Sequence, residues 1–204
     1  MVTTTLPGFS EPVHEAQRTF KGLLDALSHP GQLYSPTVKI IPPEGLTPIC
    51  ASACLTLLDL ETIVWLQPTL PNTVKNWLGF HTGCQFSEWP QDATFAIIGD
   101  MSSQSSLPDL KDFNQGSAED PEHSTTMLIQ VQDFTSGIAQ RLNGPGILES
   151  IEIAPNLPKT FWDQWTRNHH TYPQGVDCFL LSHNTVMGLP RTAKVLATCP
   201  QITH

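Results

Sequence analysis

The sequence has little charge and no long hydrophobic run. Asp, Glu, Lys and Arg make up 14% of the 204 residues, and 39% of the residues are hydrophobic. No apolar run approaches the ~20 residues of a membrane-spanning helix, and residues 1–10 hold no basic residue before an apolar stretch. We therefore expect no membrane partner and no signal peptide. The length fits one domain, residues 1–204, and the low charge leaves surface that a partner protein could cover.

The cysteines lack the spacing of a disulfide framework or a redox motif. They stand at positions 50, 54, 84, 178 and 199, and none forms a CxxC pair. An odd number without paired spacing is typical of reduced, mostly buried thiols, so we expect a cytoplasmic protein. His81 and Cys84 suggest a metal pair or a thiol activated by imidazole, but a metal needs three or four ligands and no second cluster has matching spacing. The sequence therefore predicts no metal site.

Acidic residues dominate the first two thirds of the chain. The net charge is −9; residues 1–140 hold 15 acidic and five basic side chains, whereas residues 141–204 hold four and five. An acidic body without a basic stripe argues against nucleic acid as a partner. If the chain holds an anion, its few C-terminal arginines are the residues that would do so.

Motifs that hold phosphate groups are missing, because neither GxxxxGK followed by Ser or Thr nor GxGxxG occurs. The segment 144–146 (GPG) is too short to hold a triphosphate and indicates a tight turn. Arg191 and Thr192 are better ligand-binding candidates, since arginine offers a bidentate fork and the neighbouring hydroxyl can complete an oxyanion site. The alternative, which we favour, is an arginine bound to a carboxylate or to carbonyl groups at a helix end.

The lysines do not fit a pyridoxal phosphate site. That cofactor needs a lysine for its Schiff base, usually near a hydroxyl residue, and an acidic partner for the ring nitrogen. None of the six lysines has a Ser or Thr three positions before it. Asp177 could serve as the acidic partner, but a capped carboxylate at the start of a strand is its simpler interpretation. We expect no cofactor.

Two loops hold further candidates. Glu122 lies among Glu119, Asp120 and His123, where a solvated acidic loop is the simplest interpretation and a general-base role for Glu122 is the alternative. Glu122 and His81 are kept as ligand-binding candidates, and no residue is assigned a catalytic role. Most of the five tryptophans are expected in the core, whereas Trp89, between Glu88 and Pro90, is predicted to be an interface anchor on a loop.

Hydrophobic periodicity predicts alternating helices and strands. The predicted helices are residues 13–28, 47–59, 72–78 and 159–168, with Asn72 as the N-cap of the third. The predicted strands are residues 33–41, 63–66, 94–98, 127–131, 138–142, 176–182 and 185–188, and a short helix or strand follows Arg191. The polar stretch 99–123, with one helical turn near Leu110, is the expected place of mobility or partner contact.

Interleaved elements of this kind predict a single-domain α/β protein, a three-layer α/β/α sandwich. Two hairpins, over residues 126–142 and 176–188, would make the sheet mixed rather than purely parallel. The first of these hairpins has its turn at residues 136–137, and the second crosses residues 183–184.

An ordered series of short motifs runs over about 180 residues. They are residues 12–17, Phe20, 24–31 (LDALSHPG), 55–59 (LTLLD), 61–62 (ET), 65–66 (WL), 80–82 (FHT), 93–96 (ATFA), 116–117 (GS), 121–122 (PE), 125–126 (TT), 144–147 (GPGI), 172–177 (YPQGVD) and 189–192 (LPRT). No single motif is specific. In this order, the series resembles the phosphonate-metabolism H protein family, the H subunit of the bacterial carbon–phosphorus lyase core complex.

The resemblance implies a cytoplasmic subunit that joins the G, I and J subunits. That assembly attaches a phosphonate to the ribose of ATP, expels adenine and later breaks the carbon–phosphorus bond. The resemblance also implies a fold like the large domain of pyridoxal-phosphate-dependent transferases without the cofactor, and a homodimer when isolated. The family offers no catalytic residue to carry over. Where its first helix often has paired basic residues, this chain has Thr19, Phe20 and Lys21.

The resulting hypothesis is a structural or auxiliary subunit of a phosphonate ribosyl-triphosphate transferase complex, with a role in organic phosphonate catabolism. One rival is a stand-alone small-molecule hydrolase that uses His81, Cys84 or Glu122, and turnover by the pure protein would indicate it. The other rival is a module that binds a nucleotide or phosphonate without chemistry, which saturable binding without turnover would indicate.

Overall fold

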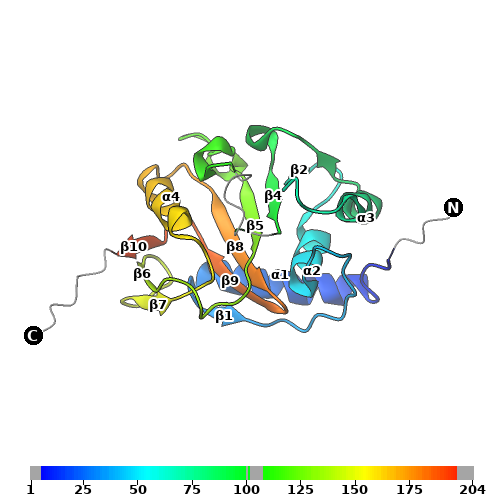
Figure 1. Ribbon diagram of the computed structural model, residues 1–204, viewed down its shortest axis with the longest axis horizontal. Coiled ribbons are helices and arrows are strands. Elements are labelled where there is room, and N and C mark those ends of the chain that lie inside the picture. The colour runs from blue at the N-terminus through cyan, green and yellow to red at the C-terminus, as the bar shows by residue number, and fades with distance from the viewer. Residues whose placement is uncertain (1–5, 100, 102–107, 197–204) are drawn as a thin grey trace, which may run out of the picture.

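A mixed sheet of seven strands forms the centre of the molecule (Figure 1). The computed structural model describes residues 6–99, 101 and 108–196. In spatial order the strands are β1 (Leu33–Tyr34), β9 (Thr185–Leu189), β8 (Asp177–Ser182), β5 (Thr126–Gln130), β4 (Phe95–Ile98), β2 (Ile63–Leu66) and β3 (Gln85–Phe86). The five strands from β8 to β3 are parallel, whereas β9 and β1 run antiparallel to their neighbours. The predicted α/β protein with a mixed sheet is therefore confirmed.

Three helices cover one face of this sheet. They are α1 (Pro12–Ser28), α2 (Pro48–Leu57) and α3 (Asn72–Thr82). Side chains alternate between the two faces along a strand, so every second strand residue meets these helices. These strand residues and the helices form one buried hydrophobic cluster, to which the strands contribute Val64, Ile97, Leu128, Phe179, Leu181 and Val186.

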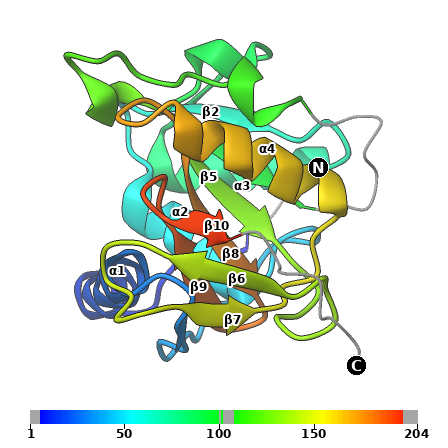
Figure 2. The ribbon, with the colours of Figure 1, turned by 90° about the vertical axis from the view of Figure 1, so that its left-hand side faces the viewer.

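The opposite face is covered by one helix and a second, smaller sheet (Figure 2). The helix is α4 (Lys159–His170), and the three-stranded sheet has the order β10 (Lys194–Leu196), β6 (Gln140–Asn143) and β7 (Ile151–Ile153). Phe161 and Trp165 of α4 pack in one buried cluster with Ile98, Met127 and Leu180 of the central strands. The predicted α/β/α layering therefore needs a correction, because strands as well as a helix form the second outer layer.

The first predicted hairpin does not form. Residues 126–130 (β5) pair in parallel with β4 on one side and β8 on the other, for example Leu128 with Ile97 and Phe179. The second predicted partner, residues 140–143 (β6), belongs to the small sheet instead. The physical reason lies in β5, whose central residues Met127, Leu128 and Ile129 are apolar and buried on both faces of the sheet, as is typical of central parallel strands. The hairpin of β8 and β9 is confirmed, with Ser182 opposite Thr185.

Several element boundaries also differ from the prediction. The strand predicted over residues 33–41 is restricted to β1, and the short strands β3 and β7 were not predicted. The third helix continues to Thr82, where Gly83 ends it in the left-handed region at φ 71°, a conformation that glycine adopts without strain. Its N-cap is Pro71 rather than Asn72.

The described residues of the polar stretch 99–123 form two single helical turns. They are η3 (Leu110–Asp112), which confirms the turn predicted near Leu110, and η4 (Pro121–His123); a third, η1 (Pro90–Asp92), precedes β4. Residues 100 and 102–107 of this stretch lie outside the described residues, as does Cys199. Within the described part of the chain, no helix is both long and apolar enough to cross a membrane.

Candidate functional site

Three of the residues singled out in the sequence meet at the amino ends of the parallel strands. Arg191, Thr192 and Glu122 line one open hollow of about 390 Å³. Glu122 belongs to η4, just before β5, and Arg191 follows β9, whose end lies beside the start of the antiparallel β8. The remaining lining residues are Pro121, Tyr172, Pro173 and Asp177. We call this feature the amino-edge hollow.

Each N–H group of the Arg191 guanidinium donates a hydrogen bond to an acceptor in the protein. Its Nε–H lies 3.2 and 3.1 Å from the two carboxylate oxygens of Asp177, and one NH₂ group donates to the carbonyls of Pro121 (2.9 Å) and Pro173 (3.2 Å). The other NH₂ group donates to Asp177 Oδ2 (2.5 Å) and to the Ser124 hydroxyl. A guanidinium has five N–H donors, and each of these five has an acceptor. The favoured interpretation, an arginine bound to a carboxylate and carbonyls, is therefore confirmed.

The carboxylate of Asp177 accepts a further hydrogen bond. Asp177 is the first residue of β8, and its Oδ1 accepts the backbone N–H of Arg191 at 2.7 Å. The two charged side chains are largely shielded from solvent, with 11% of the Arg191 side chain and 24% of the Asp177 side chain exposed. This pairing agrees with the strand-start carboxylate expected for Asp177, and it occupies the oxygens that a pyridinium nitrogen would need.

Glu122 lies at the open rim of the amino-edge hollow. Asp120, Glu122 and His123 are exposed, and the side-chain atoms with which they could bind a metal ion lie within 4.8 Å of one another. Exposed carboxylates of this kind are ordinarily solvated, which agrees with the simplest interpretation of this loop. Thr192 is half-buried beside them.

His81 lies elsewhere and holds the N-terminal segment. Its Nε2–H donates to the carbonyl of Leu6 at 2.9 Å, and the indole N–H of Trp77 donates to the same oxygen at 3.0 Å. The ring of His81 also packs 4.9 Å from that of Trp77. These contacts give the imidazole a structural role, so the structure does not bring His81 together with Arg191 and Glu122.

Cys84 is buried near the same helix, and burial raises the pKa of its thiol. The hydrogen bond between the Cys54 and Cys50 side chains, together with burial, raises the pKa of Cys54 well above its ordinary value. Burial likewise raises the pKa of Cys178. Because the thiolate is the nucleophile and the metal ligand, these thiols are poorly suited to either role. All four described cysteines are free and buried.

Trp89 is exposed over 64% of its surface, directly before η1 and therefore at the amino end of β4. Trp89 therefore remains a candidate interface anchor, because large exposed aromatic side chains often bind partner proteins.

Sequence reasoning missed two hollows at the carboxyl ends of β4 and β5. One, of about 570 Å³, is lined by Gln132, Ser136 and Asn156, and the other, of about 340 Å³, by Thr47 and Gly99; both include residues 130–132. No charged side chain lines either hollow within the described part of the chain. The only sequence signal was a polar pair, at 130 and 132, at the end of an apolar strand.

The N-terminus of α2, beside these hollows, offers no anion site. The amide of Cys50 donates to the Thr47 hydroxyl at 3.4 Å, and that of Ile49 to the carbonyl of His183 at 3.0 Å. Pro48 has no N–H to offer. The backbone donors that often bind anions at a helix start are therefore already used.

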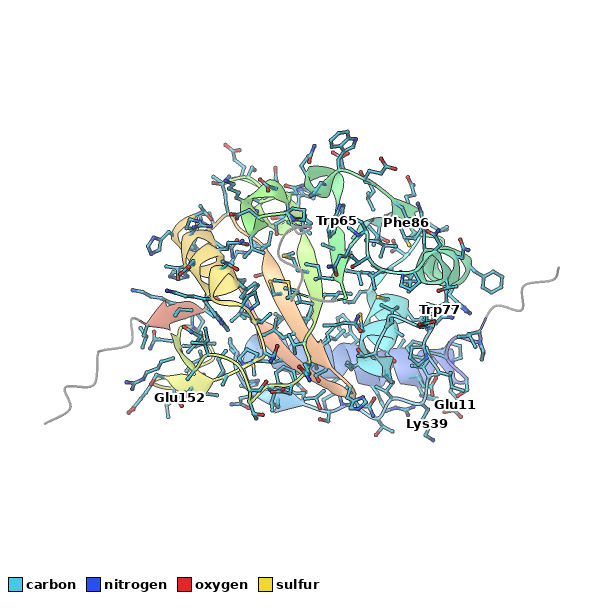
Figure 3. All side chains as sticks on the ribbon, viewed as in Figure 1. Glu11, Lys39, Trp65, Trp77, Phe86 and Glu152 are labelled. Carbon is cyan, nitrogen blue, oxygen red and sulfur yellow. The ribbon has the colours of Figure 1, made fainter. Side chains whose placement is uncertain are left out.

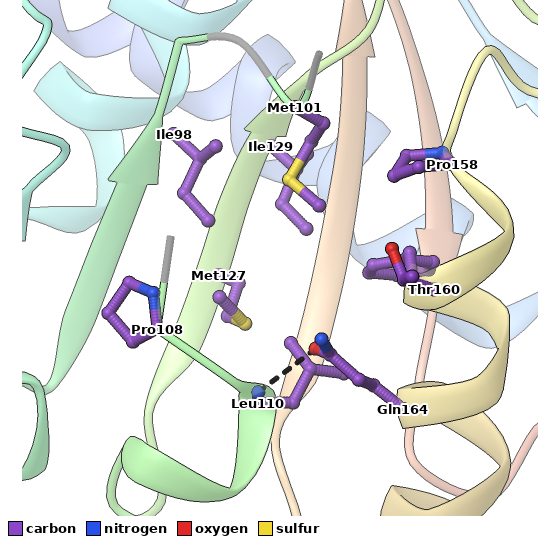
Figure 4. A pocket seen from close by; sticks show the side chains of 10 residues that line it. Ile98, Met101, Pro108, Leu110, Met127, Ile129, Pro158, Thr160 and Gln164 are labelled. Carbon is purple, nitrogen blue, oxygen red and sulfur yellow. Dashed lines mark hydrogen bonds between the residues drawn. The ribbon is translucent and has the colours of Figure 1, made fainter. Parts of the chain in front are cut away.

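Two further hollows lie on other parts of the central sheet. One, of about 40 Å³, lies between β5 and α4 and is mostly apolar; at its edge the side-chain oxygen of Gln164 accepts the amide of Leu110 at 3.1 Å (Figure 4). The other, of about 370 Å³, lies near Trp65 and Phe86 (Figure 3). There the Lys75 ammonium lies 5.2 Å from the ring centre of Phe86. Lys75 and Arg191 are the cations in the linings of these five hollows.

The chain is similar to known proteins over nearly its whole length. Residues 7–196 match the model of the family described as bacterial phosphonate metabolism protein (PhnH). A relative from Rhizobium meliloti (strain 1021), the alpha-D-ribose 1-methylphosphonate 5-triphosphate synthase subunit PhnH, is 34% identical over 189 residues, covering 92% of this chain and 93% of the relative. A putative C-P lyase subunit protein, HtxG, from Stutzerimonas stutzeri is 36% identical over 81 residues, covering 39% of this chain and 42% of the relative. The chain belongs to the PhnH family of bacterial phosphonate metabolism proteins.

Proposed function

We propose that this chain is a subunit of a carbon–phosphorus lyase complex that makes a ribose phosphonate triphosphate, and that its role is structural or auxiliary. The relatives support the assignment, since one is named as a subunit of such a synthase and matches over nearly its whole length. The single observation that carries the auxiliary role is the saturation of Arg191, whose five N–H donors are all bound by the protein itself.

The chemistry named for the relative favours catalytic residues on other subunits. Forming or holding a triphosphate needs several cations or a metal ion around the phosphates, because catalysis there is mostly positioning and electrostatic stabilisation. This chain has a net charge of −9, and Lys75 and the saturated Arg191 are the cations in the linings of the five hollows described above. Partner subunits would therefore supply the phosphate-binding surface.

The finer features of this proposal come from the family resemblance. They are the G, I and J subunits as partners, a homodimer of the isolated chain, a cytoplasmic location, and a fold like that of pyridoxal-phosphate-dependent transferases without the cofactor. The pairing of Asp177 with Arg191 bears only on the missing cofactor, because the guanidinium and the backbone N–H of Arg191 already bind both carboxylate oxygens.

Reconstitution tests the proposal. The remaining subunits are mixed with ATP and a phosphonate, and adenine release is followed with this chain, without it, and with this chain alone. We expect release from the complete mixture and a large loss when this chain is omitted. Full-rate release without it would remove the claim that the complex needs it, and release by this chain alone would show that its role is catalytic.

A further inference from the structure

We propose that the amino-edge hollow receives a basic side chain, a lysine or an arginine, from a partner polypeptide. This inference rests on the proposed role as a subunit and adds the chemistry of the contact. It concerns the opening between η4 and the turn at residues 171–175, two segments that Arg191 joins by binding the carbonyls of Pro121 and Pro173.

The cation in the floor of the hollow has no donor left for an anion. A phosphate or carboxylate group would need free N–H donors from the guanidinium of Arg191, and all five are already bound by the protein. The charges of Arg191 and Asp177 also cancel each other at 2.5 Å. The floor is therefore a rigid, nearly neutral surface, and the groups around it set the charge that an occupant meets.

Those groups are acidic. Glu122 is exposed at the rim, and its carboxylate has no hydrogen bond or ion pair to another described residue. The ion pairs within the described residues are Arg191 with Asp177 and Arg167 with Asp109. Asp120 and His123, both exposed, flank Glu122, and the potential metal-ligand atoms of these three side chains lie within 4.8 Å of one another. Because a concave surface with one sign of charge attracts the opposite sign, this rim favours a cation.

The walls suit the long stem of a basic side chain. Tyr172 is 60% exposed, and Pro121 and Pro173 add apolar surface on either side of the floor. Lysine and arginine lay their methylene stems along apolar surface and hold the charged head at the polar rim. An arginine also stacks on an aromatic face, and tyrosine is among the residues that most often dominate binding energy at interfaces.

The other hollows lack this combination. Those at the carboxyl ends of β4 and β5 have no charged lining, and the one near Phe86 contains the cation Lys75. The amino-edge hollow alone among the five joins a carboxylate without a described partner to an exposed aromatic ring. Charge complementarity thus selects a basic segment of a partner polypeptide as the occupant.

The test measures how tightly this chain binds the purified remaining subunits, by biolayer interferometry over a range of salt concentrations. Glu122→Lys reverses the charge at the rim, and Tyr172→Ala removes the wall. Glu152→Lys is the matched control, because Glu152 is also exposed but lies in β7 of the small sheet (Figure 3). We expect Glu122→Lys and Tyr172→Ala each to weaken binding about tenfold or more, and Glu152→Lys by less than about twofold.

A second measurement identifies the occupant. A photo-crosslinking amino acid at position 172 is expected to attach to a partner segment that contains Lys or Arg, and the affinity of the native chain is expected to fall as salt rises. If Glu122→Lys binds as tightly as Glu152→Lys, or if the crosslinks fall on a segment without basic residues, the docking site is wrong while the role as a subunit stands. If the native chain binds none of the other subunits, the proposed function itself fails. The Glu122 side chain makes no hydrogen bond or ion pair with another described residue, so its variant decides the question even if Tyr172→Ala folds poorly.

Discussion

Asp177, which begins β8, and Arg191, which follows β9, lie side by side at the open end of one hairpin, where the Asp177 carboxylate accepts hydrogen bonds from both the guanidinium and the backbone N–H of Arg191. The remaining guanidinium donors reach Pro121, Ser124 and Pro173, which belong to two other segments. One ion pair therefore fixes where the hairpin, η4 and the turn after α4 meet.

Replacing Arg191 by Ala should lower the free energy of unfolding by about 1–3 kcal/mol, because Asp177 loses its partner while it remains mostly shielded from water. Chemical denaturation of both proteins measures the difference. Arg18→Ala is the control, since Arg18 is exposed and makes no described hydrogen bond. An Arg191→Ala protein as stable as Arg18→Ala would contradict the anchoring role.

Two glycines should respond oppositely to substitution by alanine. A Cβ at Gly188 of β9 would run into the backbone of Ala26 in α1, whereas a Cβ at Gly79 of α3 meets only Phe86 at 3.7 Å. We expect Gly188→Ala to destabilise the fold by about 1–3 kcal/mol through overpacking. Gly79→Ala should stabilise it by about 0.5–1 kcal/mol, because alanine is the better helix former. Thermal and denaturant unfolding test both, and a Gly188→Ala protein of native stability would refute the close approach of β9 to α1.

The carboxylate of Asp133 should contribute stability that depends on acid pH. Hydrogen bonds from the Ser136 hydroxyl and from the amides of Thr135 and Ser136 lower its pKa from 3.8 to about 2. A carboxylate with a lowered folded pKa stabilises the fold above its unfolded pKa, and this contribution is lost as the pH falls toward the folded pKa. The melting temperatures of the native protein and Asp133→Asn should therefore differ above about pH 4 and converge toward about pH 2.

The matched control for that series is Asp163→Asn, on the exposed side of α4. Its melting temperature should stay close to that of the native protein over the same pH range. A difference for Asp133→Asn that does not change with pH would show that the carboxylate is not responsible.

The buried cysteines should resist alkylation in the folded protein. Cys50, Cys54 and Cys178 are fully buried, and a raised pKa keeps the thiols of Cys54 and Cys178 protonated near neutral pH. Iodoacetamide labelling followed by peptide mass spectrometry should modify them only after unfolding. We also expect reduced cysteines and no bound zinc, so a mass two protons light per cysteine pair, or about one zinc per chain by elemental analysis, would contradict this prediction.

Local patterns in the sequence predicted the local structure well. The helix predicted over residues 13–28 is confirmed as α1, and the turn at residues 183–184 could be predicted because both strands of its hairpin are adjacent in sequence. Pairing between distant segments was harder to predict. Nothing in β5 itself specifies β4 and β8 as its neighbours, and strands as short as β3 and β7 carry no measurable period.

At the candidate site, too, contacts between residues close in sequence could be predicted and contacts between distant segments could not. The chemistry of arginine favoured a carboxylate or carbonyl partner for Arg191, and Asp177 lies only 14 residues before it. Pro121 and Ser124 lie about 70 residues away, so no spacing rule could have found them. The hollows at the carboxyl ends of β4 and β5 depend on how residues 130–132 meet segments from both ends of the chain, and only the folded structure reveals that.

The strands at the two edges of the central sheet, β1 and β3, are each two residues long. An edge this short exposes few free backbone groups, so it gives a strand from another molecule little to extend. Association of two molecules by strand pairing at the edges of the central sheet is therefore disfavoured. It also follows that a partner would recognise this protein by its side chains rather than by adding a strand to the sheet.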